Sequence, residues 1–194
     1  MVTVVVTIKC YPIKLDELMA KNIQLSHPQI TFKKKQLPLC VLADGLMLAR
    51  NIGSLFRVAD AFGVEQIYLN SIPESLSDLK IRKAARSTQK TVNYSYVESE
   101  RELIKELKET GYTLISLEIT TESQSLRDFC ASHISNTNLN KICLIIGSEN
   151  EGISQTLLEH SDHTVHIPML GQNTSMNVVT ACSIALYELN NLLT

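Results

Sequence analysis

Three short polar segments of this 194-residue chain carry residue types that could bind a small ligand and act on it. The first runs from Asn51 to Arg57, the second from Gly147 to Gly152, and the third from Ile167 to Asn177. Each follows an apolar, strand-like run, and open α/β sheets bind their ligands at the carboxyl ends of strands. The spacing therefore predicts that the three segments share one site.

Each segment also has an interpretation that needs no ligand. Arg57 lies on the polar side of an amphipathic helix, and Asn51 is a good N-cap for that helix. Gly147 fits a turn before a helix, although a glycine there would also let a ligand approach the backbone closely. Ser175 can cap the final helix, whose first backbone N–H groups are ready donors for a ligand. The combination of all three segments, at three strand ends, is what favours a binding site.

Alternating strands and helices must position these segments. Apolar periodicity predicts strands over residues 39–43, 66–69, 91–97, 112–117, 141–146 and 164–167. It predicts helices over residues 52–62, 77–85, 100–110, 154–159 and 175–192. This alternation indicates an α/β fold with a mostly parallel sheet flanked by helices. Residues 1–38 lack it and are predicted to be an N-terminal extension to a domain formed by residues 39–194.

The composition is that of an ordinary soluble globular domain, with 44% hydrophobic and 20% charged residues. The five cysteines form no CxxC pair, which predicts reduced, buried thiols. Neither a signal peptide nor an apolar run long enough for a membrane span is apparent. Together these features predict a cytoplasmic protein.

Several common kinds of site are disfavoured. The chain has no G-x-G-x-x-G after its first predicted strand and no P-loop, which argues against NAD-type and NTP-type sites. His160, His163 and His166 repeat every three residues, but they straddle a predicted helix end and a strand. They are therefore not expected to share one face, and no metal site is predicted.

Basic residues form two local clusters although the net charge is −2. One cluster is Lys33 to Lys35, and the other lies between Lys80 and Lys90. Either could simply be a solvated surface. A local positive field is nevertheless what a phosphate responds to, so either cluster could also bind a nucleic acid.

Over residues 39–194 the sequence resembles the SpoU (TrmH-like) branch of the SPOUT methyltransferases. The resemblance rests on three motifs in the family's order. They read N-x-G-x-x-x-R over residues 51–57, G-S-E-x-E-G over 147–152, and I-P-M over 167–169 followed by S-M-N over 175–177.

This resemblance implies a fold, a cofactor and a reaction. The chain from about residue 141 to 194 would form a deep trefoil knot that holds S-adenosylmethionine. The reaction would transfer a methyl group to a ribose 2′-hydroxyl of tRNA or rRNA, in a homodimer whose active site lies at the subunit interface. By the match, the cofactor-binding residues would be Leu117, Glu118, Gly147, Ile167, Met169 and Met176.

The resemblance also implies which residues surround the reacting groups: Asn51, Arg57, Glu149, Ser175 and Asn177. The family's usual proposal makes the motif-one arginine, here Arg57, the base. Because an arginine side chain is effectively always protonated, we expect Arg57 instead to bind a phosphate and stabilise the developing alkoxide. The residues expected to contact RNA are Lys80, Arg82, Lys83, Arg86, Ser87 and Lys90.

Two other interpretations stay open. The first is a non-catalytic RNA-binding relative of the same fold, which loss of Arg57, Glu149 or Asn177 would have favoured; all three are present. The second is an unrelated α/β nucleotide-binding protein, which would not bind S-adenosylmethionine.

Overall fold

The computed structural model describes residues 7–8, 24–26, 29–31, 35–73, 78–86, 88–134 and 139–193. The chain divides into two compact units, Met1–Lys35 and Gln36–Thr194. In the first unit, β1 (Thr7–Ile8) pairs antiparallel with β2 (Ile30–Thr31). The second unit carries the three polar segments.

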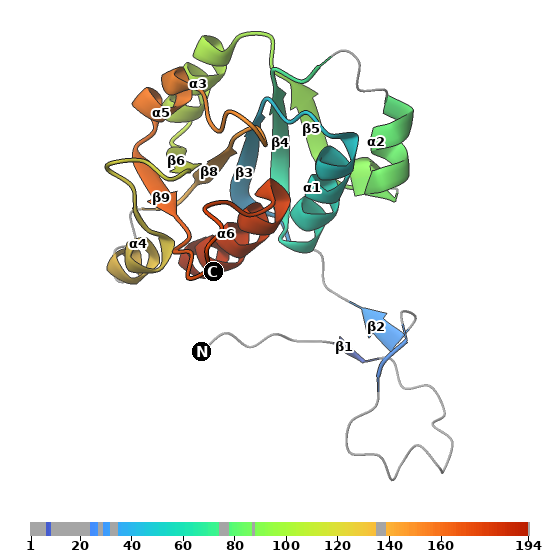
Figure 1. Ribbon diagram of the computed structural model, residues 1–194. Coiled ribbons are helices and arrows are strands. Elements are labelled where there is room, and N and C mark those ends of the chain that lie inside the picture. The colour runs from blue at the N-terminus through green and yellow to red at the C-terminus, as the bar shows by residue number, and fades with distance from the viewer. Residues whose placement is uncertain are drawn as a thin grey trace. The chain divides into compact units, whose positions relative to one another are not determined.

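The described part of the second unit is built on a seven-stranded sheet in the order β5-β4-β3-β8-β6-β9-β7. Every neighbouring pair in this sheet is parallel. The strands, all labelled in Figure 1 except β7, are β3 (Leu37–Asp44), β4 (Val64–Asn70), β5 (Asn93–Tyr96), β6 (Thr113–Leu117), β7 (Gln124–Ser125), β8 (Ile142–Ile146) and β9 (His163–His166). All five residues of β8 are buried, as expected for a central strand covered on both faces.

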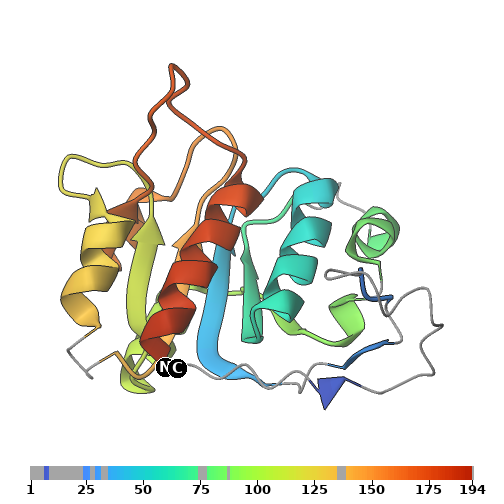
Figure 2. The same cartoon turned by 90° about the horizontal axis from the view of Figure 1, so that it is seen from below.

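Helices cover both faces of this sheet. Those on one face are α1 (Ala49–Ala61), α2 (Asp78–Ala85), α4 (Leu126–His133) and α6 (Val178–Leu193), of which α4, α6 and α1 follow one another across Figure 2. Those on the other face are α3 (Glu100–Glu109) and α5 (Gln155–His160). Alternate residues of β3 enter the two cores, with Val41 on the α1 side and Leu42 on the α3 side. The predicted α/β fold is confirmed.

Both predicted N-caps beside the polar segments were wrong. Helix α1 begins at Ala49, not Ile52, and Asn51 lies inside its first turn with 4% of its surface exposed. Helix α6 begins at Val178, and its cap is Asn177 rather than Ser175. The reason in the first case is that the Asn51 side chain bonds to distant parts of the chain instead of to its own helix.

Other helix ends follow the sequence more closely. Gly63 and Gly111 follow the C-cap residues of α1 and α3 and adopt φ values of +67° and +85°, as predicted for helix-ending glycines. The strand predicted over residues 91–97 forms only over Asn93–Tyr96, because the 3-10 helix η3 (Thr88–Lys90) and a turn precede β5. Strand β7 and helix α4 were missed. A signal for α4 was present, since Ser125 caps it by accepting from the Asp128 N–H at 3.5 Å.

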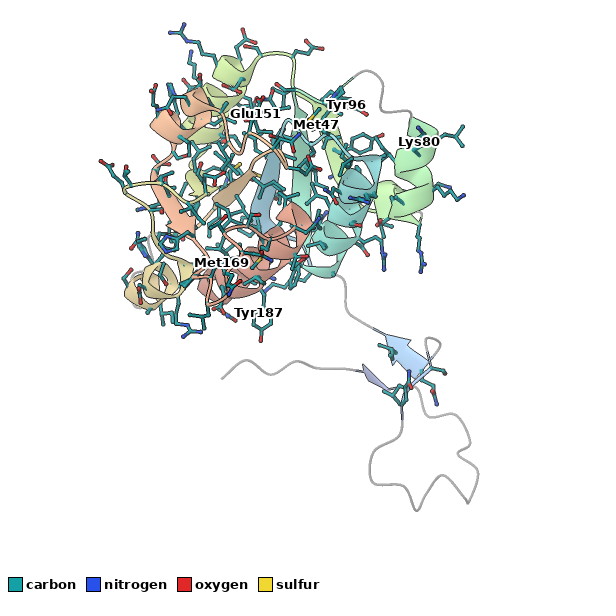
Figure 3. All side chains as sticks on the ribbon, viewed as in Figure 1. Met47, Lys80, Tyr96, Glu151, Met169 and Tyr187 are labelled. Carbon is teal, nitrogen blue, oxygen red and sulfur yellow. The ribbon has the colours of Figure 1, made fainter. Side chains whose placement is uncertain are left out.

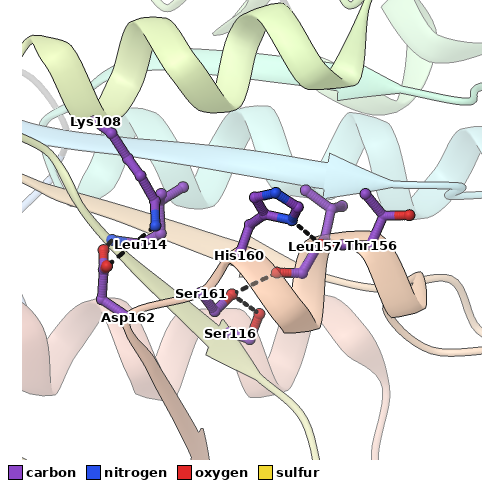
Figure 4. Close-up of polar contacts among 8 residues, drawn as sticks. All are labelled: Lys108, Leu114, Ser116, Thr156, Leu157, His160, Ser161 and Asp162. Carbon is purple, nitrogen blue, oxygen red and sulfur yellow. Dashed lines mark hydrogen bonds and ion pairs between the residues drawn. The ribbon is translucent and has the colours of Figure 1, made fainter.

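The link from α5 into β9 is fastened to β6 by side chains (Figure 4). Asp162 accepts from the Leu114 N–H at 2.8 Å and from Lys108 Nζ at 3.3 Å. The hydroxyl oxygens of Ser116 and Ser161 lie 2.7 Å apart. These contacts hold the start of β9 beside β6, with which it pairs. The trefoil knot over about residues 141–194 stays a prediction.

The buried thiols match the sequence analysis where the structure describes them. Cys40, Cys130, Cys143 and Cys182 are free and buried, and Cys10 lies outside the described residues. None of the helices in the described ranges is long and apolar enough to cross a bilayer.

Candidate active site at the ends of three strands

A cavity of about 560 Å³ lies at the carboxyl ends of β6, β8 and β9 and at the N-terminal ends of α1 and α6. Each of the three polar segments contributes to its wall, as Asn51, Glu149 and Met169 illustrate. Met169 is labelled in Figure 3. Segments that lie far apart in the sequence therefore meet at one site.

The predicted site residues fall into two groups. Those predicted to bind the cofactor all line the cavity: Leu117, Glu118, Gly147, Ile167, Met169 and Met176. Of those predicted around the reacting groups, Asn51, Glu149, Ser175 and Asn177 line it, whereas Arg57 is exposed on α1 and does not.

A directional chain of hydrogen bonds joins the three segments. The backbone N–H groups of Val179 and Thr180 donate to Asn177 Oδ1 at 3.0 and 3.2 Å. Asn177 Nδ2 donates to Asn51 Oδ1 at 3.2 Å, and Asn51 Nδ2 donates to Glu149 Oε1 at 2.6 Å. Each amide thus donates through nitrogen and accepts through oxygen, which determines the orientation of both side chains.

Glu149 is held as an anion at the end of this chain. Its second oxygen, Oε2, accepts from the Met47 N–H at 3.0 Å. Burial alone raises the pKa of Glu149, but the hydrogen bonds from Met47 and Asn51 outweigh it and lower that pKa below its usual value. Glu149 therefore places a negative charge in the cavity wall, with each oxygen bound by an uncharged donor.

The turn after β8 closes upon itself. Ser148 and Gly152 pair across it, with the Ser148 N–H donating to the Gly152 carbonyl at 2.9 Å. A Cβ on Gly147 would lie 2.1 Å from the Gly152 carbonyl carbon and 2.3 Å from the Ile153 nitrogen. One predicted role of Gly147 was to let a ligand approach the backbone closely. In the structure, the glycine is already needed for this turn to pack against itself.

Two buried polar residues that support the same turn were missed. Asp44 and Asn70 end β3 and β4 and are 6% and 5% exposed. Asn70 Nδ2 donates to Asp44 Oδ1 at 2.9 Å and to Glu100 Oε2 at 2.8 Å, and Asp44 Oδ2 accepts from the Ser154 N–H at 2.9 Å. Polar residues at the carboxyl ends of two apolar strands were the signal that could have found them.

The sequence matches a known protein family along most of its length. A sequence model of the SpoU rRNA methylase family matches residues 38–187. The chain belongs to the SpoU rRNA methylase family. The 23S rRNA (guanosine-2′-O-)-methyltransferase RlmB of Neisseria meningitidis serogroup B is 30% identical to it over 152 residues, which is 78% of this chain. The chain spans 57% to 60% of the length of such curated relatives.

Solved structures share the SpoU fold. The TrmH/SpoU tRNA modifying enzyme of A. aeolicus superposes with a TM-score of 0.70 at 26% identity, covering 82% of this chain and 77% of that one. AviRb of Streptomyces viridochromogenes, in complex with the cofactor AdoMet, superposes with a TM-score of 0.67 at 24% identity, covering 85% and 63%. The sheet and helices of this SpoU protein are therefore arranged as in these structures.

Two basic side chains that were not predicted at the site, Arg50 and His166, also line the cavity of this SpoU protein. His166 Nδ1 lies 3.0 Å from Ser123 Oγ. His160 instead bonds to the carbonyl of Thr156, so the repeated histidines do not converge. In the ranges that the structure describes, no three His, Cys, Asp or Glu residues are grouped to hold a metal ion.

The residues predicted to contact RNA gather on α2 and around η3. Helix α2 packs closely on α1, since a Cβ on Gly53 would lie 2.3 Å from the Ala84 Cβ. The basic helix therefore touches the helix that carries the first motif. The exposed members are Lys80, Lys83, Arg86 and Lys90, of which Lys80 is labelled in Figure 3. The Arg82 side chain, Ser87, Lys33 and Lys34 lie outside what the structure describes.

Proposed function

We propose that this SpoU-family protein is an S-adenosylmethionine-dependent methyltransferase that modifies a ribose 2′-hydroxyl of tRNA or rRNA in the cytoplasm. The observation that carries the proposal is the single cavity in which all three motifs meet, joined by the hydrogen-bond chain from Asn177 through Asn51 to Glu149. The activity named for RlmB and the cofactor held by AviRb support it.

The cavity suits S-adenosylmethionine in size and chemistry. Its volume of about 560 Å³ lies within the range of roughly 300–1,000 Å³ found for small-molecule sites. Leu117, Ile146 and Ile167 offer apolar surface for an adenine ring, and the carboxylates of Glu118 and Glu149 suit the cofactor's positive charges. When bound, the cofactor supplies an electrophilic methyl group. Gly147, Met169 and Met176 complete the set of residues proposed to hold it.

The chain's own residues would position the ribose and stabilise its oxygen. Asn51, Ser175 and Asn177 offer hydrogen-bonding groups in the same wall, where the fixed amide orientations favour one ribose geometry. Because Arg57 does not line its own chain's cavity, we place it at the cavity of the second subunit of a homodimer. There its guanidinium would bind the target's phosphate and stabilise the developing alkoxide. The trefoil knot over about residues 141–194 belongs to the same proposal.

Nucleoside analysis of cellular RNA tests this function. Total tRNA and rRNA from cells with and without the gene would be digested and compared by mass spectrometry. We expect loss of one 2′-O-methylated nucleoside, restored by the unchanged protein and by the control Arg101→Ala, which removes a charge from α3, but not by Arg57→Ala. Unchanged ribose methylation in both RNA classes would favour the non-catalytic RNA-binding relative.

A further inference from the structure

Two basic side chains, Arg50 and His166, line the cavity among the described residues, and they differ in how they are held. His166 Nδ1 is tied to Ser123 Oγ at 3.0 Å. Arg50 is exposed in the first turn of α1, and within the described ranges no hydrogen bond or ion pair engages its guanidinium. Arg50 is thus a cation at the cavity that has no counter-ion among the described residues.

Glu149 is the carboxylate of the hydrogen-bond chain, and both of its oxygens already accept hydrogen bonds. Its Oε1 accepts from the side chain of Asn51, the residue after Arg50, and its Oε2 accepts from the Met47 N–H. The two charges line one cavity without pairing to each other. A cavity with a separate anion and cation in its wall matches a ligand that carries charges of both signs.

Helix geometry relates Arg50 to Arg57. Seven residues on an α-helix turn through nearly two full turns and rise about 10 Å, so both arginines lie on one side of α1. Gly53 lies between them on that side, where α1 packs against Ala84 of α2. Of these two arginines, Arg50 lines the cavity and Arg57 does not. Arg50 therefore lies at the cavity end of α1, about 10 Å along the helix axis from Arg57.

We propose that Arg50 is a further substrate-binding residue, whose guanidinium binds an anionic group at the cavity. That group is either the carboxylate of S-adenosylmethionine or the RNA phosphate beside the target ribose, since both match the guanidinium fork. This inference rests on the proposed function and adds to it a contact within one chain that Arg57 does not make.

Binding measurements on the full-length protein distinguish the two sources. Isothermal titration would compare S-adenosylmethionine with decarboxylated S-adenosylmethionine, which lacks only the carboxylate. The proteins would be the unchanged chain, Arg50→Ala, Arg50→Lys and the charge-matched control Arg101→Ala on α3. If Arg50 binds the carboxylate, Arg50→Ala lowers the affinity for S-adenosylmethionine by about tenfold or more. The affinity for the decarboxylated compound stays unchanged. Arg50→Lys keeps the charge but loses the fork, so its affinity for S-adenosylmethionine should lie between those of the unchanged protein and Arg50→Ala.

RNA binding forms the second arm. Total tRNA and rRNA from cells lacking the gene would be titrated at several salt concentrations. If Arg50 binds a phosphate, Arg50→Ala leaves S-adenosylmethionine affinity unchanged, weakens RNA binding and makes the slope of log K against log salt shallower by about 1.

The outcomes separate the two proposals. If the unchanged protein binds S-adenosylmethionine and RNA, and Arg50→Ala matches Arg101→Ala with both, Arg50 is not a substrate-binding residue and the proposed function stands. If the unchanged protein binds neither, the proposed function fails and the role of Arg50 fails with it.

Discussion

Asn51 is the residue through which the hydrogen-bond chain passes, and its orientation is testable. Asn51→Asp keeps the shape but puts a carboxylate oxygen where Nδ2 lies, 2.6 Å from Glu149 Oε1. Two carboxylates this close repel, so we expect a loss of about 2–3 kcal/mol in the free energy of unfolding at pH 7. Urea unfolding midpoints at pH 7 and pH 5 would measure it.

The pH dependence of that loss follows from protonation. In Asn51→Asp, protonating one of the two carboxylates removes the repulsion. The loss in the free energy of unfolding, relative to the unchanged protein, should therefore shrink as the pH falls toward 5. In the unchanged protein the lowered pKa of Glu149 contributes stability above the ordinary value of 4.5, and this is lost as the pH falls through the folded-state pKa. An equal deficit at both pH values would show that the two carboxylates do not interact.

Asn177 combines a helix cap with a link to Asn51, and two variants separate these roles. Asn177→Ser keeps a capping oxygen for the Val179 and Thr180 N–H groups, whereas Asn177→Ala removes it. We expect the Ala variant to be about 1 kcal/mol less stable than the Ser variant in urea unfolding. Both lose the donor to Asn51 and should lose methyl transfer alike. Equal stability of the two would contradict the cap.

Arg57→Lys tests the proposed role of the exposed arginine. Lysine keeps the positive charge but loses the bidentate fork, so we expect methyl transfer to fall by about 100-fold. Affinity for S-adenosylmethionine should barely change, because Arg57 does not line its own chain's cavity. Single-turnover methylation and titration calorimetry would measure the two effects. Near-normal turnover would remove Arg57 from the reacting groups.

At the scale of elements, the contact between α1 and α2 explains the glycine of the first motif. Alanine normally stabilises an exposed helix relative to glycine by about 1 kcal/mol. At Gly53, however, the added Cβ would lie 2.3 Å from the Ala84 Cβ and 2.8 Å from backbone atoms of α2. Gly53→Ala should therefore destabilise the protein by about 1–3 kcal/mol through overpacking. The neighbouring Ser54→Ala, in the same helix, is the control for helix propensity.

RNA binding gives the same variant a second readout. Forcing α2 away from α1 would move the exposed lysines of α2 relative to the cavity, so RNA affinity should fall in Gly53→Ala but not in Ser54→Ala. A Gly53→Ala protein as stable as the unchanged one would mean that the two helices separate at no cost.

The proposed homodimer makes Arg57 act across subunits. Arg57→Ala and Asn177→Ser should each lose activity alone, and co-expression should restore part of it. Random pairing makes about half of the dimers mixed, each with one intact site, so about a quarter of the sites should work. Methyl transfer by the co-purified proteins would measure this. No restoration would place Arg57 at its own chain's cavity or exclude the dimer.

Local signals along the sequence determined much of this protein. Apolar runs and their periods predicted the long strands and most helices, and glycines predicted where α1 and α3 end. The three motifs likewise predicted a shared site. The helices and strands could be predicted because their apolar residues recur at short, regular spacings along the sequence. The short β7 and the eight-residue α4 carry too few repeats to stand out.

Which side chains meet could be learned only from the folded chain. Asn51 is a good N-cap in isolation, but its partners Glu149 and Asn177 lie 98 and 126 residues away. Gly147 is a glycine because the turn packs on itself, and Arg50 reaches the cavity while Arg57 does not. Strand order and the rotation of α1 on the sheet decide these contacts. Both arise from long-range packing, which no local repeat in the sequence records.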